Sequence, residues 1–148
     1  MKILQLDERQ IQGISIRTTN ADEMNPKSAR IAGLYQRFDE EVRVDYRAGE
    51  RVYGVYFDYE SDATGEFSVL AGSEQALSGS LELEQIRIPA GRYMVFAASG
   101  EMPQVVIDTW SRIWEYYASD DVPYKRAYSV DFEYYKSPNE IEIYIAIL

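Results

Sequence analysis

The sequence contains no cysteine and no histidine. Without cysteine it can form no disulfide, thiol nucleophile or iron–sulfur cluster. Without histidine it has no Ser-His-Asp triad, imidazole base or ordinary zinc site. Basic residues are scarce as well, since 15 Lys and Arg stand against 25 Asp and Glu, and the formal net charge is −10. That balance argues against binding a nucleic-acid backbone, which needs clustered Lys and Arg.

No apolar run reaches the roughly 18–20 residues of a membrane span, and the N-terminus has no signal-peptide core. We therefore expect a cytoplasmic protein that needs no metal or cofactor and binds neither nucleic acid nor membrane. Both ends of the chain read as strands of the domain itself, so we also expect a free-standing module without a DNA-binding region.

Tyrosine is abundant, with 13 Tyr and 2 Trp in 148 residues. These side chains recur where a surface must be both apolar and hydrogen-bonding, as in binding sites and interfaces. Most of the tyrosines are expected to belong to an ordinary core and sheet surface. The length fits a single domain over 1–148, because domains usually have about 100–200 residues.

Hydrophobic periodicity predicts the order β-α-β-β twice. The first half has strands over 11–19, 53–59 and 67–71, and a helix that begins at Asn25-Pro26. The second half has strands over 83–88, 93–98, 128–135 and 141–148, and a helix opened by Pro103. A shift of 75 places YGVYFDY (53–59) on YSVDFEY (128–134), and the same shift superposes the two helices.

Matching segments in the same order favour an internal repeat. We predict an α+β fold of duplicated βαββ units related by a pseudo-twofold axis, with repeat 1 over about 1–80 and repeat 2 over about 81–148. The units would form an antiparallel sheet with two main helices and a ligand groove between the repeats. The apolar faces expected of the helices are Ile31, Leu34, Tyr35 and Phe38 in the first, and Val106, Trp110, Ile113 and Trp114 in the second.

Carboxylates lie among aromatic residues in the last two strands. Asp131, Glu133 and Tyr135 share one strand face, and the isoleucines of 141–147 alternate onto a face that packs beneath the helices. Glu142 and Tyr144 then share the opposite face, and in an antiparallel hairpin Glu133 is expected near them there. This face has two interpretations: a solvated sheet surface, which antiparallel sheets often have, or a covered site that needs many tyrosines.

A covered site would favour a positive ligand. Burying an ionised carboxylate among aromatic rings costs several kcal/mol unless something compensates the charge. A lipophilic cation supplies that compensation, and each Tyr or Trp face adds about 0.5–2 kcal/mol of cation–π attraction. Glu133 with Glu142 also has a second interpretation, as an acid pair for hydrolysis, although no further catalytic group is evident.

Five segments carry a family resemblance: IQGISIRT (11–18), IAGLYQRF (31–38), IPAGRYMVF (88–96), FEYY (132–135) and EIYIA (142–146). In this order they resemble the gyrase-inhibitor-like (GyrI-like) small-molecule-binding domain, which is also the effector-binding module of AraC-type and MerR-type multidrug-responsive activators. The resemblance implies a duplicated βαββ fold whose groove binds lipophilic cations. The sequence departs from the family at Ala146, where proline is common.

Site residues follow from the same resemblance. The central acid of the family matches Glu133, and the polar face of its last strand matches Glu142 and Tyr144. The aromatic residue of its first helix is Tyr35, and Trp110 is the counterpart in the second repeat. Asp58, the repeat partner of Glu133, would either share the acidic role or face water.

We expect a non-enzymatic binding protein for cationic amphipathic small molecules, with no catalytic residues. Two alternatives stay open: a gyrase-inhibitor-like modulator that contacts another protein, and a hydrolase of electrophilic natural products. A homodimer formed through a sheet edge is a further expectation.

Overall fold

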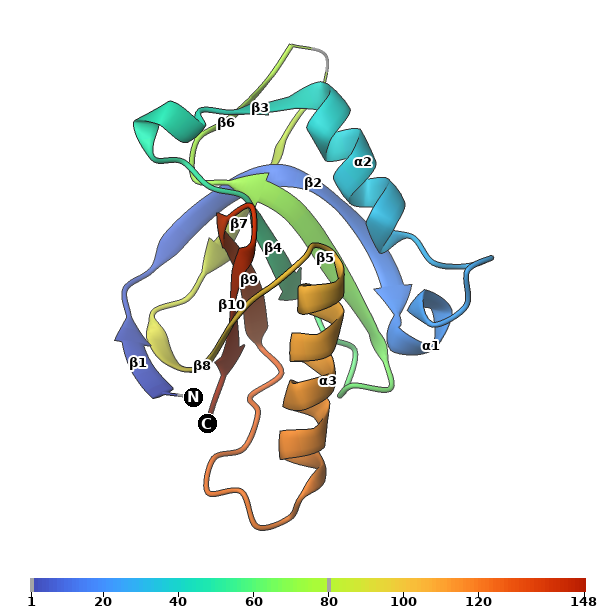
Figure 1. Cartoon of the computed structure of the whole chain (residues 1–148), viewed down its shortest axis with the longest axis vertical. Helices are drawn as coiled ribbons and strands as arrows, with labels where there is room; N and C mark the ends of the chain where they lie inside the picture. The colour runs from blue at the N-terminus through green and yellow to red at the C-terminus, as the bar shows by residue number, and fades with distance from the viewer. Residues whose placement is uncertain (1, 80) are drawn as a thin grey trace.

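One antiparallel sheet of eight strands, in the order β1-β8-β10-β9-β4-β5-β2-β7, forms the frame of the molecule (Figure 1). This computed structural model describes residues 2–79 and 81–148. The sheet strands are β1 (Lys2–Leu6), β2 (Arg9–Thr19), β4 (Tyr53–Phe57), β5 (Glu66–Ser73), β7 (Glu84–Ile88), β8 (Gly91–Ser99), β9 (Val130–Ser137) and β10 (Glu140–Ala146). A separate two-stranded ribbon pairs β3 (Val42–Val44) with β6 (Ala76–Ser78).

The helices are α1 (Asn20–Glu23), α2 (Ile31–Glu41) and α3 (Gln104–Ala118), with a short 3₁₀ turn, η1 (Tyr46–Ala48). The sheet curls into a half-barrel, and α2 and α3 lie against the same face of it (Figure 1). This arrangement confirms the predicted α+β class with an antiparallel sheet and two main helices. No helix within residues 2–79 and 81–148 is long and apolar enough to span a bilayer.

The strand order is mirrored about the centre of the sheet. The central pair is β9 and β4, followed outward by β10 and β8 on one side and by β5 and β2 on the other. Strands with the same place in the two predicted repeats therefore occupy equivalent places in the sheet. The duplication itself, with its boundary near residue 80, stays a prediction.

The two outermost strands cross between the halves. β1, from the first half, pairs with β8 of the second, with Lys2 opposite Val95 and Leu6 opposite Gly91. β7, from the second half, pairs with β2 of the first, with Arg9 opposite Ile88. Each half thus places its first strand on the outer edge of the other half.

The apolar stripe of α2 was predicted correctly, but its start was not. Leu34 and Phe38 are buried against the sheet, as expected from their spacing. The helix begins at Ile31, because Asn25 forms a turn in which its side chain accepts a hydrogen bond from the Lys27 amide at 3.0 Å. Glu23 instead provides the hydrogen-bond acceptor at the helix N-terminus, and its side chain accepts a hydrogen bond from the Ile31 amide at 3.0 Å.

Helix α3 begins directly after Pro103, as predicted, but its buried face is rotated by one position. Val105, Thr109 and Ile113 are buried. Of the expected set, only Ile113 packs fully against the sheet. Val106, Trp110 and Trp114 instead line the space between the two helices.

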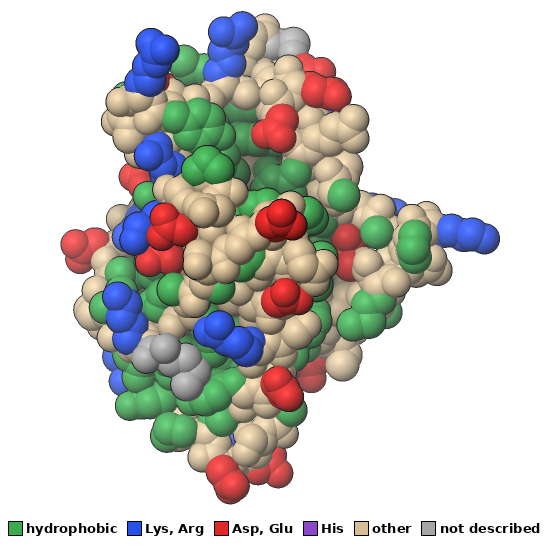
Figure 2. Space-filling view, in the orientation of Figure 1, with side chains coloured by type: hydrophobic (Ala, Val, Ile, Leu, Met, Phe, Trp, Pro, Cys, Tyr) green, Lys and Arg blue, Asp and Glu red, His purple; other side chains and the backbone are tan. Residues whose placement is uncertain are grey.

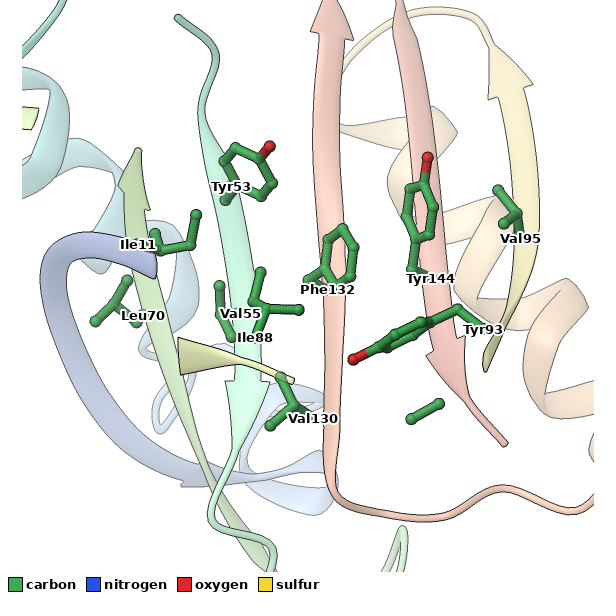
Figure 3. Close-up of a cluster of buried hydrophobic side chains, with 11 residues drawn as sticks. Ile11, Tyr53, Val55, Leu70, Ile88, Tyr93, Val95, Val130, Phe132 and Tyr144 are labelled. Carbon is green, nitrogen blue, oxygen red and sulfur yellow. The ribbon is translucent and has the colours of Figure 1, made fainter. Parts of the chain in front are cut away.

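The isoleucines of β10 form the core beneath α3, as their alternation predicts. Ile141, Ile143 and Ile145 are almost completely buried in a cluster with Ile113 and Phe96. A separate apolar cluster fills the other face of the sheet, around stacked Phe132 and Tyr144, with Tyr53, Val55, Leu70 and Tyr93 (Figure 3). Both faces of the central strands are therefore covered.

Candidate binding site

Glu133 lies in the middle of β9 with a side chain only 1% exposed, on the face that carries the helices. Its carboxylate accepts four hydrogen bonds. The Tyr35 and Tyr135 hydroxyls each donate to Oε1 at 2.9 Å. The Tyr56 hydroxyl and the Trp110 indole nitrogen each donate to Oε2 at 2.7 Å. The donors come from α2, β4, α3 and β9, so one side chain connects both helices to the centre of the sheet.

All of these donors are neutral. Within residues 2–79 and 81–148, no Lys or Arg forms an ion pair with Glu133. Burial, and then the negative charge of Glu133, raises the pKa values of Tyr35 and Tyr56 well above 10. The pKa of Tyr135 is raised for the same two reasons. The hydroxyls therefore remain protonated donors at neutral pH, and they solvate the carboxylate without cancelling its charge.

A glycine across the strand pair makes room for this cluster. Gly54 is paired with Glu133 in the β4–β9 register. A Cβ atom at this position would collide with the Tyr35 hydroxyl and with Oε1 of Glu133. Since both atoms are fixed by the hydrogen bond between them, the cluster requires a residue without a side chain at position 54.

The carboxylate lies at the bottom of a groove of about 1320 Å³ between α2, α3 and the sheet. In Figure 2, hydrophobic side chains are visible in the depression between the surfaces formed by the two helices, with acidic side chains nearby. The rings that line the groove are Tyr35, Tyr46, Tyr56, Tyr59, Phe67, Trp110, Trp114 and Tyr135. Several of them contact each other, for example Tyr56 and Trp110 with centroids 5.1 Å apart and Tyr35 and Tyr135 at 5.8 Å.

A second buried carboxylate, Asp131, lies on the same side of the sheet. Arg126 lines the groove and forms an ion pair of 2.8 Å with Asp131, which is completely buried. Asp131 also accepts a hydrogen bond from the Tyr59 hydroxyl at 2.6 Å and one from the Ala146 amide at 2.8 Å. Unlike Glu133, this carboxylate has a positive partner.

Glu142 and Tyr144 lie on the opposite face of the sheet, so the expectation that they neighbour Glu133 is wrong. Tyr144 is paired with Phe132, and the two rings stack with their centroids 4.4 Å apart (Figure 3). The Tyr144 hydroxyl donates to Glu142 at 3.1 Å. Glu133 is paired instead with Ile143, so it shares the face of the isoleucines.

A bulge in the β9–β10 hairpin explains this difference. Ser137 pairs with Glu140, but the next pair is Tyr135 with Ile141, so Lys136 is an extra residue. Without the extra residue, Glu133 would face Tyr144 as expected. A register change of one residue moves side chains to the other face of a strand.

Of the residues predicted for the site, the structure brings Glu133, Tyr35 and Trp110 together. Sequence reasoning missed Tyr56 and Tyr135 as donors, although Tyr135 had been placed on the same strand face as Glu133. Asp58, the proposed repeat partner, is exposed and forms an ion pair with Arg17 at 3.6 Å. Of its two interpretations, the solvent-facing one is correct.

Known proteins resemble this chain over almost its whole length. The family model described as integron-associated effector binding protein (Cass2) matches residues 2–147. YobU of Bacillus subtilis, whose name describes a candidate transcriptional regulator, is 30% identical over 158 aligned residues, covering 98% of this chain and 96% of YobU. These matches confirm the GyrI-like resemblance inferred from the sequence.

Solved structures are similar over the whole fold. Integron cassette protein VCH_CASS2, from the mobile metagenome of Vibrio cholerae, has a TM-score of 0.90 and 44% identity, with 99% of this chain and 95% of that one covered. SAV2435, whose structure was solved bound to tetraphenylphosphonium, has a TM-score of 0.68 and 18% identity, with 99% and 93% covered. The second likeness shows a shared fold.

Proposed function

Because the chain belongs to the family of integron-associated effector-binding proteins, we propose that its groove binds lipophilic cations as effectors and releases them unchanged. The observation that carries the proposal is the carboxylate of Glu133, which is buried among aromatic rings without a positive partner within the described residues. A cation in the groove would supply the missing charge.

The groove offers three contributions to such a complex. The carboxylate attracts a positive charge in a region of low dielectric constant. The faces of Tyr56, Trp110 and Trp114 each add about 0.5–2 kcal/mol of cation–π attraction. Apolar ligand surface adds roughly 25 cal/mol per Å² buried. Together these support a dissociation constant of about 1 μM, or about −8 kcal/mol.

Two further observations support binding of a cation rather than catalysis. Both oxygens of Glu133 are occupied by donors from Tyr35, Tyr56, Trp110 and Tyr135, which leaves this acid poorly placed to activate a water molecule. SAV2435, which has the same fold, was solved with tetraphenylphosphonium, a lipophilic cation. Dimerisation, contact with gyrase and a cytoplasmic location stay predictions from the sequence.

A pair of probes of equal size and opposite charge tests the proposal. Tetraphenylphosphonium and tetraphenylborate have nearly the same shape, so calorimetric titration of both separates charge from apolar contact. We expect the cation to bind and the anion not to bind. Equal binding of the two would show that the groove recognises only apolar surface.

Glu133→Gln removes the charge with little change of shape, and we expect it to weaken tetraphenylphosphonium binding about tenfold or more, the effect of losing one interaction with a charged group. Glu142→Gln is the matched control, because Glu142 lies on the other face of the same sheet. It should bind the cation like the unmodified protein. Equal losses in both variants would contradict the role of Glu133.

A further inference from the structure

The groove contains a second polar feature, Arg126, which the binding of a simple cation does not use. Its side chain is only 6% exposed, and one nitrogen, Nη2, donates to Asp131 at 2.8 Å. The guanidinium carbon lies 4.3 Å from the centre of the Tyr128 ring. The pair of Arg126 and Asp131 carries no net charge, and the contacts of Arg126 with Asp131 and with the Tyr128 ring hold it in place.

One donor of this buried guanidinium has no acceptor. Nε of Arg126 is shielded from solvent and forms no hydrogen bond within the described residues. Buried donors are normally paired, and an unpaired one in a native structure calls for a partner. Arg126 lines the groove, so a bound molecule that displaces the atoms covering Nε would bring its acceptor within reach.

A second unpaired polar group is a tyrosine hydroxyl at the end of α3. Tyr117 OH is also shielded from solvent and unpartnered among the described residues. Burial raises the pKa of Tyr117 to about 12, with smaller effects from Tyr116 and Asp131, which raise it, and from Arg126, which lowers it. Two polar groups in this part of the molecule, one of them a pure donor, therefore lack a hydrogen-bond partner.

The chemistry of the missing partner follows from the local charge. A carboxylate or phosphate would add an uncompensated negative charge beside the neutral Arg126–Asp131 pair. A neutral oxygen acceptor, such as a ketone, ester or ether, satisfies a donor without that cost.

We propose that the Arg126 end of the groove is an acceptor subsite, which selects lipophilic cations that also carry a neutral oxygen acceptor. This inference rests on the proposed function of Glu133. Asp131, the partner of Arg126, is two residues from Glu133 on the same strand face, which corresponds to roughly 7 Å along the strand. We take about that distance as the separation between the cationic centre and the acceptor of a preferred ligand.

Matched phosphonium ions test the subsite. Hexyltriphenylphosphonium is compared by calorimetry with its analogue that carries a ketone on the fifth carbon of the chain, which lies about 7 Å from phosphorus when extended. We expect the ketone to bind about tenfold more tightly, the gain from one hydrogen bond to a charged group. Equal affinities would overturn the subsite, and so would tighter binding of the corresponding carboxylate than of the ketone.

Arg126→Lys keeps a positive partner for Asp131 but lacks the Nε donor, so the preference for the ketone should disappear while the hexyl compound binds as before. Arg47→Lys is the control, since Arg47 is exposed and outside the groove. It should keep the tenfold preference. A preference that survives in Arg126→Lys would contradict the assignment.

A second measurement needs no variant. When the ketone is moved from the fifth to the third carbon, where the phosphonium keeps its charge at neutral pH, it no longer reaches Arg126, and the preference should be lost in the unmodified protein. An unchanged preference would place the acceptor elsewhere. If none of these phosphonium ions bound, the proposed function itself would fail, whereas equal binding of all of them would refute only the subsite.

Discussion

The indole nitrogen of Trp110 donates a 2.7 Å hydrogen bond to Oε2 of Glu133 and so fastens α3 to the central strand β9. Tyr35 does the same for α2 through Oε1 of the same carboxylate, at 2.9 Å. The two helices that form the walls of the groove are therefore held by one side chain at its bottom. The separation of the walls is set by hydrogen bonds as well as by apolar packing.

Trp110→Phe should destabilise the protein by about 1–3 kcal/mol, because it leaves a buried charged acceptor short of one donor. The free energy of unfolding in urea measures the loss. Trp114→Phe is the control, since Trp114 is 37% exposed at the groove surface and should lose less than about 0.5 kcal/mol. Equal losses in the two variants would mean that the hydrogen bond to Glu133 contributes nothing.

Gly54→Ala should destabilise the fold by roughly 2 kcal/mol or more and weaken cation binding, because the added Cβ collides with the Tyr35 hydroxyl and with Glu133. Gly33→Ala provides the contrast, since no atom lies near the added methyl group on α2. It should stabilise the protein by about 0.5–1 kcal/mol, because alanine favours helix. Urea unfolding of both variants checks these opposite signs.

Stability should decrease at alkaline pH. Burial and the charge of Glu133 raise the pKa values of Tyr35, Tyr56 and Tyr135 well above 10 in the folded protein, whereas in the unfolded chain these hydroxyls titrate near the usual value of about 10. Their stabilising contribution is therefore complete below about pH 10 and is lost as the pH rises further towards the folded-state values.

Urea unfolding at pH 8, 9.5 and 10.5, together with tyrosinate absorbance, measures this effect. Glu133→Gln should reduce the alkaline loss, because the charge that adds to the effect of burial is removed. A free energy of unfolding that stays constant through pH 10.5 would contradict the assignment.

Glu23→Ala should cost about 1 kcal/mol, the usual effect of losing a helix N-terminal partner. Glu23 accepts from the amides of Arg30 and Ile31 at the start of α2, at 2.9 and 3.0 Å. Hydrogen exchange should accelerate at these two amides. Glu115→Ala, on the exposed side of α3, should leave both stability and exchange in α2 unchanged.

The family resemblance assigned Glu133, Tyr35 and Trp110 to the site, and side-chain periodicity within single segments predicted which face some of its residues share. The helical spacing of Leu34 and Phe38 gave the buried face of α2 and therefore the direction of Tyr35. The period of two in β9 placed Asp131, Glu133 and Tyr135 on one face, where each makes the contacts described above. Periodicity succeeds here because it depends only on the geometry of one helix or strand.

Relations between segments could not be predicted in the same way. The expected position of Glu142 and Tyr144 depended on the register of the β9–β10 hairpin. The extra residue Lys136 shifts that register by one residue, so Glu133 lies on the opposite face from Glu142 and Tyr144. Nothing in the local hydrophobic pattern marks the bulge. Tyr56 was missed for a related reason, because its contact with Glu133 arises from the pairing of β4 with β9, two strands far apart in the sequence.

The crossing of the outer strands has a consequence for how the groove can be lost. β1 completes the sheet of the second half and β7 completes that of the first, much as two subunits exchange arms in an intertwined dimer. Tyr35 and Tyr56 come from one half, and Trp110, Glu133 and Tyr135 come from the other. A cut in the connection between the two halves would deprive each fragment of an edge strand and of part of the groove lining. A bound effector, which contacts residues of both halves, would then help to hold the two fragments together.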